Sequence, residues 1–426
     1  MNLLVISIFL VGYCAIIFEH LIKINKAASA IVTGVLCWTA YIMIAPDYHH
    51  VTSQLIEHIG NFSGILFFLM GAMTVVELID AHNGFDLVTD RIGVKGKRQL
   101  LWVTGLLAFF LSAILDNLTT TIVMISLLMK FSLSKDERMF FTGIVIIAAN
   151  AGGAWSPIGD VTTTMLWMDG HITSINIIKS LFFPGLICAA IPLLIVSFRI
   201  KGQLQEHTRD GANLPFGKQL RDRNLIFIFG ITMILLVPLF KSVTHLPPFM
   251  GMLLALGMLW IVTEIIHAKK NIYDKRPFSA VQALTRIDIP SVLFFLGILI
   301  CISALDSTGI LGMLSIWLDK TIGNVTTITL LIGFLSAIID NVPLVAAAMG
   351  TYGNGAFGVD HHFWTFLSYC AGTGGSALII GSAAGVAAMG IAQIPFFWYL
   401  RKITPIALAG YLAGAGTYLL QMVIFH

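Results

Sequence analysis

Long apolar runs, separated by short polar stretches, dominate the pattern of hydrophobic and polar positions along this chain. A helix needs about 20 mostly apolar residues to cross the hydrocarbon core of a bilayer. On that criterion the pattern predicts ten membrane spans, at residues 2–22, 27–45, 61–80, 139–168, 176–199, 223–240, 247–266, 288–306, 362–390 and 403–425.

Two further apolar stretches, 98–131 and 324–351, differ from these spans. Each is long enough for two half-depth helices, and each carries an Asp-Asn pair near its centre. Backbone that is not helical is tolerated at membrane depth only where it faces protein or water. We therefore expect both stretches to be re-entrant hairpins whose polar tips face a cavity.

The two hairpins share a sequence motif. Residues 110–117 read FLSAILDN and residues 334–341 read FLSAIIDN. The similarity continues downstream, where Gly152-Gly153 is echoed by Gly374-Gly375. It predicts two repeats, 61–199 and 288–426, which contain the broken helices 139–168 and 362–390. Residues 1–60 and 223–287 are expected to add scaffold helices, and the polar, basic segment 200–222 to link the repeats in the cytoplasm.

The basic residues fix the expected topology. If the N-terminus is outside and both hairpins are re-entrant, only Lys179, Lys241 and Lys320 of the 25 Lys and Arg residues fall outside. This is the bias of the positive-inside rule, and it disappears if either hairpin is a full span. Both termini are then outside, and the two repeats have inverted orientations, as in many secondary transporters.

Composition agrees with an all-α polytopic membrane protein. The chain has 426 residues, of which 57% are hydrophobic and 11% charged, and soluble domains carry about 25% charged residues. No basic, aromatic-rich patch suggests nucleic acid, and the five cysteines lack metal-ligand spacing. The sequence also lacks ATP-binding and hydrolase motifs, so we expect neither an enzyme nor a cofactor.

The hairpin tips carry the first candidate chemistry, at Asp116, Asn117, Asp340 and Asn341. Helix capping alone would explain Asp or Asn at these positions. However, an acid at the bilayer centre costs at least about 2.5 kcal/mol, so we expect a functional role in addition to capping.

The broken helices supply further oxygen ligands. The first break contains Asn150, Asp160, Thr162 and Thr163, and the second contains Ser376 and Ser382. Oxygen ligands of these kinds suit a hard cation. An aspartate that holds either a proton or Na⁺ is a minimal exchanger. The first break is the more acidic one, so the sequence leaves open whether both halves bind an ion or the second mainly gates.

Three more acids, Glu77, Asp80 and Asp306, lie near the ends of predicted spans. They are candidates for a proton or ion access pathway, and water-facing helix ends would explain them equally well.

At residues 112–117, 336–341 and 150–164 the sequence resembles the NhaD-type sodium/proton antiporters of the ion transporter superfamily. The last segment includes Gly-Gly, Trp-Ser-Pro and Asp-Val-Thr-Thr. The resemblance implies elevator-type exchange of cytoplasmic Na⁺ or Li⁺ for external H⁺, a role in pH homeostasis, a homodimer, and a bacterial inner membrane. The implied cation or proton site is Asp116, Asn117, Asn150, Asp160, Thr162, Thr163, Ser336, Asp340, Asn341 and Ser376, with sodium at Asp116, Asn117, Asn150, Asp160, Asp340 and Asn341.

Two other functions remain open at this point. A sodium-coupled dicarboxylate or arsenite-type carrier would have the same fold, although two carboxylates at the tips disfavour an anionic substrate. An intramembrane aspartyl protease would also need buried acids, but its Gly-x-Gly-Asp motif is absent from the sequence.

Overall fold

The computed structural model describes residues 2–89, 94, 96–129, 131–200, 202–204, 217–353 and 355–425. Within these residues the regular structure is helical, and the one β-type feature is an isolated bridge between Gly96 and Gln203. Most of the predicted linker at 200–222 lies outside the described residues.

Eight helices of the described part are long and apolar enough to cross a membrane, or nine if one bent pair counts as a span. The bent pair is α20 (Ala383–Ile391) with α21 (Phe396–Lys402), at 118°. The protein is thus a polytopic membrane protein. The eight are α3 (Lys26–Ile44), α4 (Tyr48–Ala81), α6 (Lys97–Leu115), α10 (Ser174–Arg199), α11 (Gly217–Thr244), α12 (Pro248–Ile266), α15 (Ile289–Ser307) and α22 (Thr404–Phe425).

Several predicted spans are interrupted. The first consists of α1 (Asn2–Ile17) and α2 (Glu19–Ile22). The span predicted at 139–168 consists of α8 (Lys135–Ala154) and α9 (Val161–Met168), and the span at 362–390 of α19 (His362–Gly374) and α20. Pro157 and Gly159 account for the break between α8 and α9, and Gly375 and Gly381 for the break between α19 and α20.

Two elements differ from the sequence prediction. Helix α4 begins at Tyr48 rather than near residue 61. Asp47 caps its N-terminus, and its first turns carry polar residues that lie outside the apolar core. Helix α16 (Ile310–Thr321) lies in a stretch with no predicted span; it is amphipathic and too short to span. Four further helices have five residues or fewer: α5 (Asp86–Thr89), α13 (Ile272–Lys275), η1 (Arg276–Phe278) and α14 (Ala280–Leu284).

The first predicted hairpin is formed by α6 and α7 (Asn117–Met129), which meet at Asp116. The first residue of α6 is ion-paired to the first turn of α8, with Lys97 Nζ 2.7 Å from Glu137 Oε1. Farther along, Ser112 Oγ donates to Ala149 O at 2.6 Å. Helices α6 and α8 therefore run in parallel, and α7 returns to the side on which α6 began. At about 20 Å, α7 is too short to span by itself.

The second hairpin has the same construction. It consists of α17 (Val325–Leu335) and α18 (Asn341–Tyr352), which meet at residues 336–340. Ser336 Oγ donates to Ala371 O at 2.7 Å. The end of α18 returns to the start of α19, where the rings of Tyr352 and Phe363 are 4.9 Å apart.

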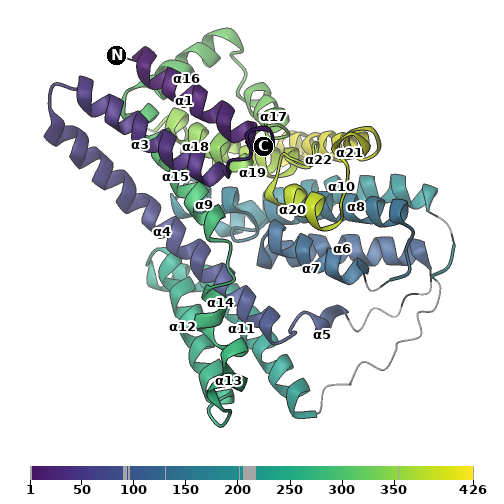
Figure 1. Cartoon of the computed structure of the whole chain (residues 1–426). Helices are drawn as coiled ribbons and strands as arrows, with labels where there is room; N and C mark the ends of the chain where they lie inside the picture. The colour runs from purple at the N-terminus through teal and green to yellow at the C-terminus, as the bar shows by residue number, and fades with distance from the viewer. Residues whose placement is uncertain are drawn as a thin grey trace.

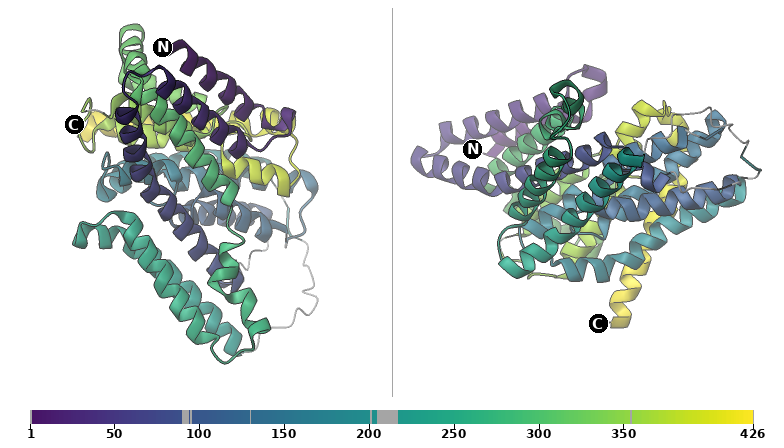
Figure 2. Two further views of the ribbon diagram at one scale, coloured as in Figure 1. Left: turned by 60° about the vertical axis from the view of Figure 1, so that its left-hand side comes forward. Right: turned by 90° about the horizontal axis from the view of Figure 1, so that it is seen from below.

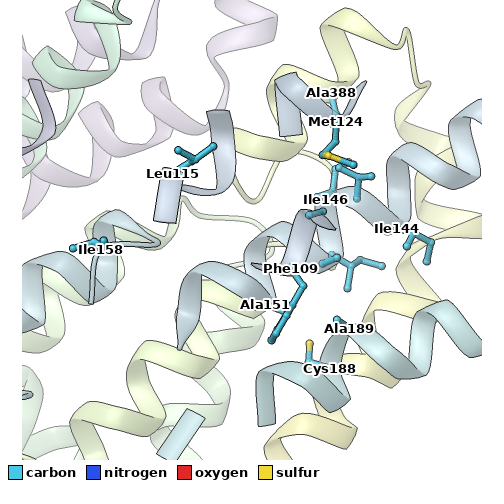
Figure 3. Close-up of a cluster of buried hydrophobic side chains, with 14 of the residues drawn as sticks. Phe109, Leu115, Met124, Ile144, Ile146, Ala151, Ile158, Cys188, Ala189 and Ala388 are labelled. Carbon is cyan, nitrogen blue, oxygen red and sulfur yellow. The ribbon is translucent and has the colours of Figure 1, made fainter. Parts of the chain in front are cut away.

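Glycines explain how closely each hairpin packs on its broken helix. A Cβ at Gly152 would lie 2.1 Å from Phe109 O, and a Cβ at Gly374 would lie 2.0 Å from Gly333 O. Only glycine permits these approaches. The same backbone crossing thus occurs in both halves. Figure 3 shows Phe109 at the first crossing among apolar side chains that include Ala151 of α8 and Cys188 of α10.

A second group of long helices consists of α3, α4, α11, α12 and α15. Helix α3 packs along α15, where Trp38 Nε1 donates to Ile300 O at 3.0 Å and a Cβ at Gly34 would lie 3.0 Å from Gly297 O. Helix α4, with 34 residues, packs on α15 and α12. Figure 1 shows α4 running from the region of α1 and α3 to the pair α11 and α12, and Figure 2 shows that pair at one edge of the molecule.

Candidate functional site

The buried carboxylate of Asp160 lies where the two halves meet. Asp160 precedes α9 in an extended conformation, but its side chain does not cap that helix. It is 3% exposed. Asn117 Nδ2 donates to Asp160 Oδ1 at 3.2 Å, and Asn341 Nδ2 donates to Asp160 Oδ2 at 3.1 Å. One acid is therefore held by the tips of both hairpins.

Neutral side chains complete the surroundings of this acid. The Thr162 hydroxyl donates to Asp160 Oδ2. Asn150 is fully buried, and its Oδ1 accepts from Asn117 Nδ2 at 2.9 Å. Asn150 Nδ2 donates to Ser376 Oγ at 2.9 Å and to Ser382 Oγ at 3.0 Å. We call these residues the Asp160 cluster: Asn117, Asn150, Asp160, Thr162, Asn341, Ser376 and Ser382.

The cluster brings together six of the ten residues proposed for the site from the sequence, and it adds Ser382. Two of the remaining four bond elsewhere. Thr163 Oγ1 is 2.9 Å from Ser368 Oγ, and Ser336 holds the second hairpin to α19. The two tip aspartates lie at the edge of the cluster and differ from each other.

Asp116 lies at the break between α6 and α7 with φ 89° and ψ 162°. This region of the backbone map is almost restricted to glycine, and an aspartate there is strained. The carboxylate caps α7, because Oδ1 accepts from Thr119 N at 2.7 Å and Oδ2 from Thr119 Oγ1 at 3.0 Å. Asp116 thus has the capping role considered above.

Asp340 has ordinary backbone angles, φ −49° and ψ 140°, and no capping bond. Its Oδ2 instead accepts from Lys26 Nζ at 3.0 Å. The Lys26 ammonium also lies 4.3 Å from the centre of the Phe294 ring. Sequence reasoning missed this partner, because Lys26 looked like the other basic residues that follow a span.

A cavity of about 60 Å³ adjoins the cluster. Its polar lining includes Asp116, Asn117, Asp160 and Ser291, and its wall opposite the first hairpin includes Phe68. We call it the central cavity. It has room for a few water molecules or a partly hydrated small ion. Neither Lys nor Arg occurs among the described residues that line it.

A larger cavity of about 250 Å³ lies next to the central one and shares Met73, Val76 and Leu118 with it. It contains Glu77 and Asp80, and we call it the Glu77 cavity. Glu77 Oε1 is 3.3 Å from Arg286 Nη1, so a cation lies beside the acid.

A separate cavity of about 260 Å³ lies farther toward the start of α4. Its lining includes His58 of α4, Asp306 of α15 and Gly350 of α18, and we call it the Asp306 cavity. All three acids proposed for an access pathway therefore line cavities: Glu77 and Asp80 line the Glu77 cavity, and Asp306 lines the Asp306 cavity.

Broken helices that surround a polar cluster in a membrane protein are the architecture of a secondary transporter. Comparison with known proteins gives the family. A family model described as citrate transporter matches residues 5–365. The chain is 46% identical over 413 residues to sodium/proton antiporter 1 of Arabidopsis thaliana, covering 97% of this chain and 71% of that protein.

Bacterial relatives match over nearly their whole length. The chain is 33% identical over 452 residues to the Na⁺/H⁺ antiporter NhaD of Alkalimonas amylolytica, covering 99% of this chain and 91% of that protein. It is 31% identical over 441 residues to NhaD of Vibrio cholerae, covering 97% and 90%. The chain belongs to the citrate transporter family and, within it, to the NhaD-type sodium/proton antiporters.

Proposed function

We propose that this protein exchanges Na⁺ or Li⁺ for H⁺ and that Asp160 is the group for which the two ions compete. The observation that carries the proposal is the environment of this carboxylate. The side chains that bond it, Asn117, Asn341 and Thr162, are all neutral. A buried charge without a counter-ion is costly, so the site favours a state in which a proton or a cation neutralises it.

The amides supply a way to pass between the two states. Asn117 and Asn341 donate N–H groups to Asp160. A side-chain amide also carries a carbonyl oxygen. Rotation of either amide would withdraw its donor and present this oxygen, so the cluster could offer carboxylate, amide and hydroxyl oxygens to Na⁺. Protonation of Asp160 would remove the charge that holds the cation, and exchange follows from this competition.

The access route that we propose alternates between the two larger cavities. Helix α7 of the first hairpin lines the Glu77 cavity, and α18 of the second lines the Asp306 cavity. His58 and Glu77 are separated along α4 by about 28 Å, close to the thickness of the hydrocarbon core. This arrangement favours inverted repeats and an elevator movement of the hairpins.

The direction of exchange is part of the same proposal. Lys97 and Arg286 lie toward the Glu77 end, which favours a cytoplasmic location for that cavity. Cytoplasmic Na⁺ would then enter through the Glu77 cavity, and external protons through the Asp306 cavity. The homodimer and the bacterial inner membrane stay predictions from the resemblance; the relatives include plant as well as bacterial proteins.

The description of the family as citrate transporters makes the anion carrier the second candidate. A citrate anion in the central cavity would face Asp116 and Asp160 with no basic residue in the described lining. Like charges at such distances repel strongly where water is scarce. The cavity therefore favours a cation.

Purified protein in proteoliposomes separates the two candidates. A pH-sensitive dye inside the vesicles is followed while Na⁺, Li⁺, K⁺ or citrate is added outside, and uptake of labelled citrate is measured in parallel. We expect proton movement with Na⁺ and Li⁺ and no citrate uptake above that of protein-free vesicles. Citrate uptake without Na⁺-dependent proton movement would overturn the proposal in favour of the anion carrier.

A further inference from the structure

Lys26 joins the tip of the second hairpin to the helices outside it. It is the first residue of α3, and its backbone N–H donates to Glu19 Oε1 at 3.1 Å, which fixes the start of that helix. Helix α3 is in turn held along α15 by close backbone packing. The Lys26–Asp340 ion pair, at 3.0 Å, therefore connects the α3–α15 pair to the hairpin.

The first hairpin shows no equivalent ion pair among the residues that the structure describes. There, the Asp116 carboxylate bonds within its own hairpin, to Thr119. In the described part of the chain, Lys26 is the one side chain that bonds the Asp340 carboxylate. The two side chains are 24% and 14% exposed, so the pair is largely shielded from water.

The next residue along the chain connects this pair to the ion site. Asn341 is 4% exposed and donates to Asp160 Oδ2. A displacement of the tip by about 1 Å would break that bond, because hydrogen bonds weaken steeply beyond about 3.2 Å. The geometry at Asp340 therefore determines whether Asn341 reaches Asp160.

We propose that Lys26 is a positioning residue for transport and that Asp340 serves as its partner rather than as a ligand of the transported cation. The ion pair holds the second tip so that Asn341 engages Asp160. This inference rests on the proposed function, since Asp160 is taken as the exchanging group. It gives Asp340 a role different from the one that the family resemblance implies.

Charge rescue tests the assignment. Lys26→Met and Asp340→Asn each leave one partner uncompensated, and the double variant removes both charges together. We expect each single change to raise the apparent KM for Na⁺ about tenfold through the disturbed Asn341 bond. The double variant should return to within about threefold of wild type, because relieving both charges leaves no unpaired group. Lys26→Arg should behave like wild type.

Lys97→Met is the matched control. Lys97 is also the first residue of its helix and forms an ion pair of similar exposure, with Glu137, but far from either tip. It should leave the apparent KM unchanged. Thermal unfolding of each purified variant, measured with and without Na⁺, separates loss of fold from loss of the site. If Lys26→Met does not fold, the apparent KM values of the double variant and of Lys26→Arg still test whether Lys26 positions the tip.

Two outcomes would overturn the inference while wild-type exchange is intact. A double variant as inactive as Asp340→Asn would make Asp340 a cation ligand, and an unchanged KM in folded Lys26→Met would remove the positioning role. Absence of Na⁺-dependent proton movement in the wild-type protein would instead overturn the proposed function. In that case the shift of the unfolding temperature by Na⁺, compared between wild type and Lys26→Met, still tests whether Lys26 supports Na⁺ binding.

Discussion

The two hairpin tips carry nearly the same eight residues, yet their aspartates have different environments. The flanking serines make matching bonds, Ser112 to Ala149 O and Ser336 to Ala371 O, at 2.6 and 2.7 Å. The acids that follow diverge: Asp116 is strained and caps its own helix, and Asp340 pairs with Lys26. The motif thus sets where the tip lies, and residues outside the motif set what the acid does there.

The broken helices show the same division. Ser382, at the position of Asp160 in the second half, caps α20 through Gly385 N at 3.2 Å. Gly372 occupies the position of Asn150, and a Cβ there would lie 3.3 Å from Asp160 Oδ2. The second broken helix therefore contributes neutral hydroxyl groups, which accept from Asn150, and space, and the first contributes the charge. The contrast favours one ion site built from both halves over two equivalent sites.

The strongest test of this contrast compares Asp160→Asn with Ser382→Ala. We expect Asp160→Asn to lower the rate of Na⁺-dependent proton movement at least about 100-fold, because it removes the charge that the cation and the proton share. Ser382→Ala removes two neutral hydrogen bonds, those from Asn150 Nδ2 and Gly385 N, and should lower the rate about fivefold at most. Both are measured in proteoliposomes. Equal losses would mean that the halves share the ion equally.

The next test concerns a feature that the halves have in common. Gly152→Ala and Gly374→Ala each place a Cβ about 2 Å from a backbone oxygen. We expect each to destabilise the folded protein by about 3 kcal/mol, with similar losses of unfolding temperature. Gly257→Ala is the control, since a Cβ there meets nothing within 4 Å. A large difference between the two crossings would contradict their equivalence.

Backbone strain predicts opposite orders of stability at the tips. At position 116 Asp116→Gly should be more stable than Asp116→Ala by about 1–2 kcal/mol, because φ is 89° and ψ 162°. At position 340, where φ is −49°, Asp340→Ala should be more stable than Asp340→Gly by about 0.5 kcal/mol. Unfolding temperatures of the four variants give both orders. An Asp116→Ala variant as stable as Asp116→Gly would show that Asp116 is not strained.

The smallest expected effect is a pH dependence of stability, which comes from histidines that differ between the two ends of α4. Just beyond the end of α4, His82 Nε2 is 2.9 Å from His267 Nε2, whereas near its start His58 bonds Ser307 at 3.1 Å. Burial, with the Lys270 ammonium and the His82 ring, lowers the pKa of His267 to about 4. Burial also lowers the pKa of His82.

A histidine with a lowered pKa binds fewer protons in the folded state than the unfolded value of about 6.5 would give. The neutral form of such a histidine is therefore fully compatible with the folded state above about pH 6.5. As the pH falls toward 4, protonation favours the unfolded state and the free energy of unfolding decreases. We expect the unfolding temperature of wild type to fall by a few degrees between pH 7.5 and 5, and His267→Gln to reduce that fall. A fall equally steep in His267→Gln would exclude the histidine pair as the source of the pH dependence.

The sequence predicted what repetition and hydrophobicity encode. The breaks of the helix at each Asp-Asn tip and within residues 139–168 and 362–390 follow from the repeated octapeptide and the glycines. Asp160 was among the residues that the sequence proposed for the site, and that role stays a prediction. It could not predict the Lys26–Asp340 pair, because nothing local connects residues 314 positions apart. It also missed the strain at Asp116, because nearly identical motifs adopt different backbone angles at their aspartates. It missed the early start of α4, because the polar residues there resemble a loop.

The length of α4 has a consequence for the surrounding lipid. Its 34 residues extend about 51 Å, and the hydrocarbon core is about 30 Å thick. Even with both headgroup layers a bilayer is only about 40–45 Å thick, so the helix must tilt or project from the membrane. The polar turns after Tyr48 place this excess at the end that carries His58, which lines the Asp306 cavity. A thicker or thinner bilayer would therefore change the tilt of α4 and, with it, the depth of this cavity in the lipid.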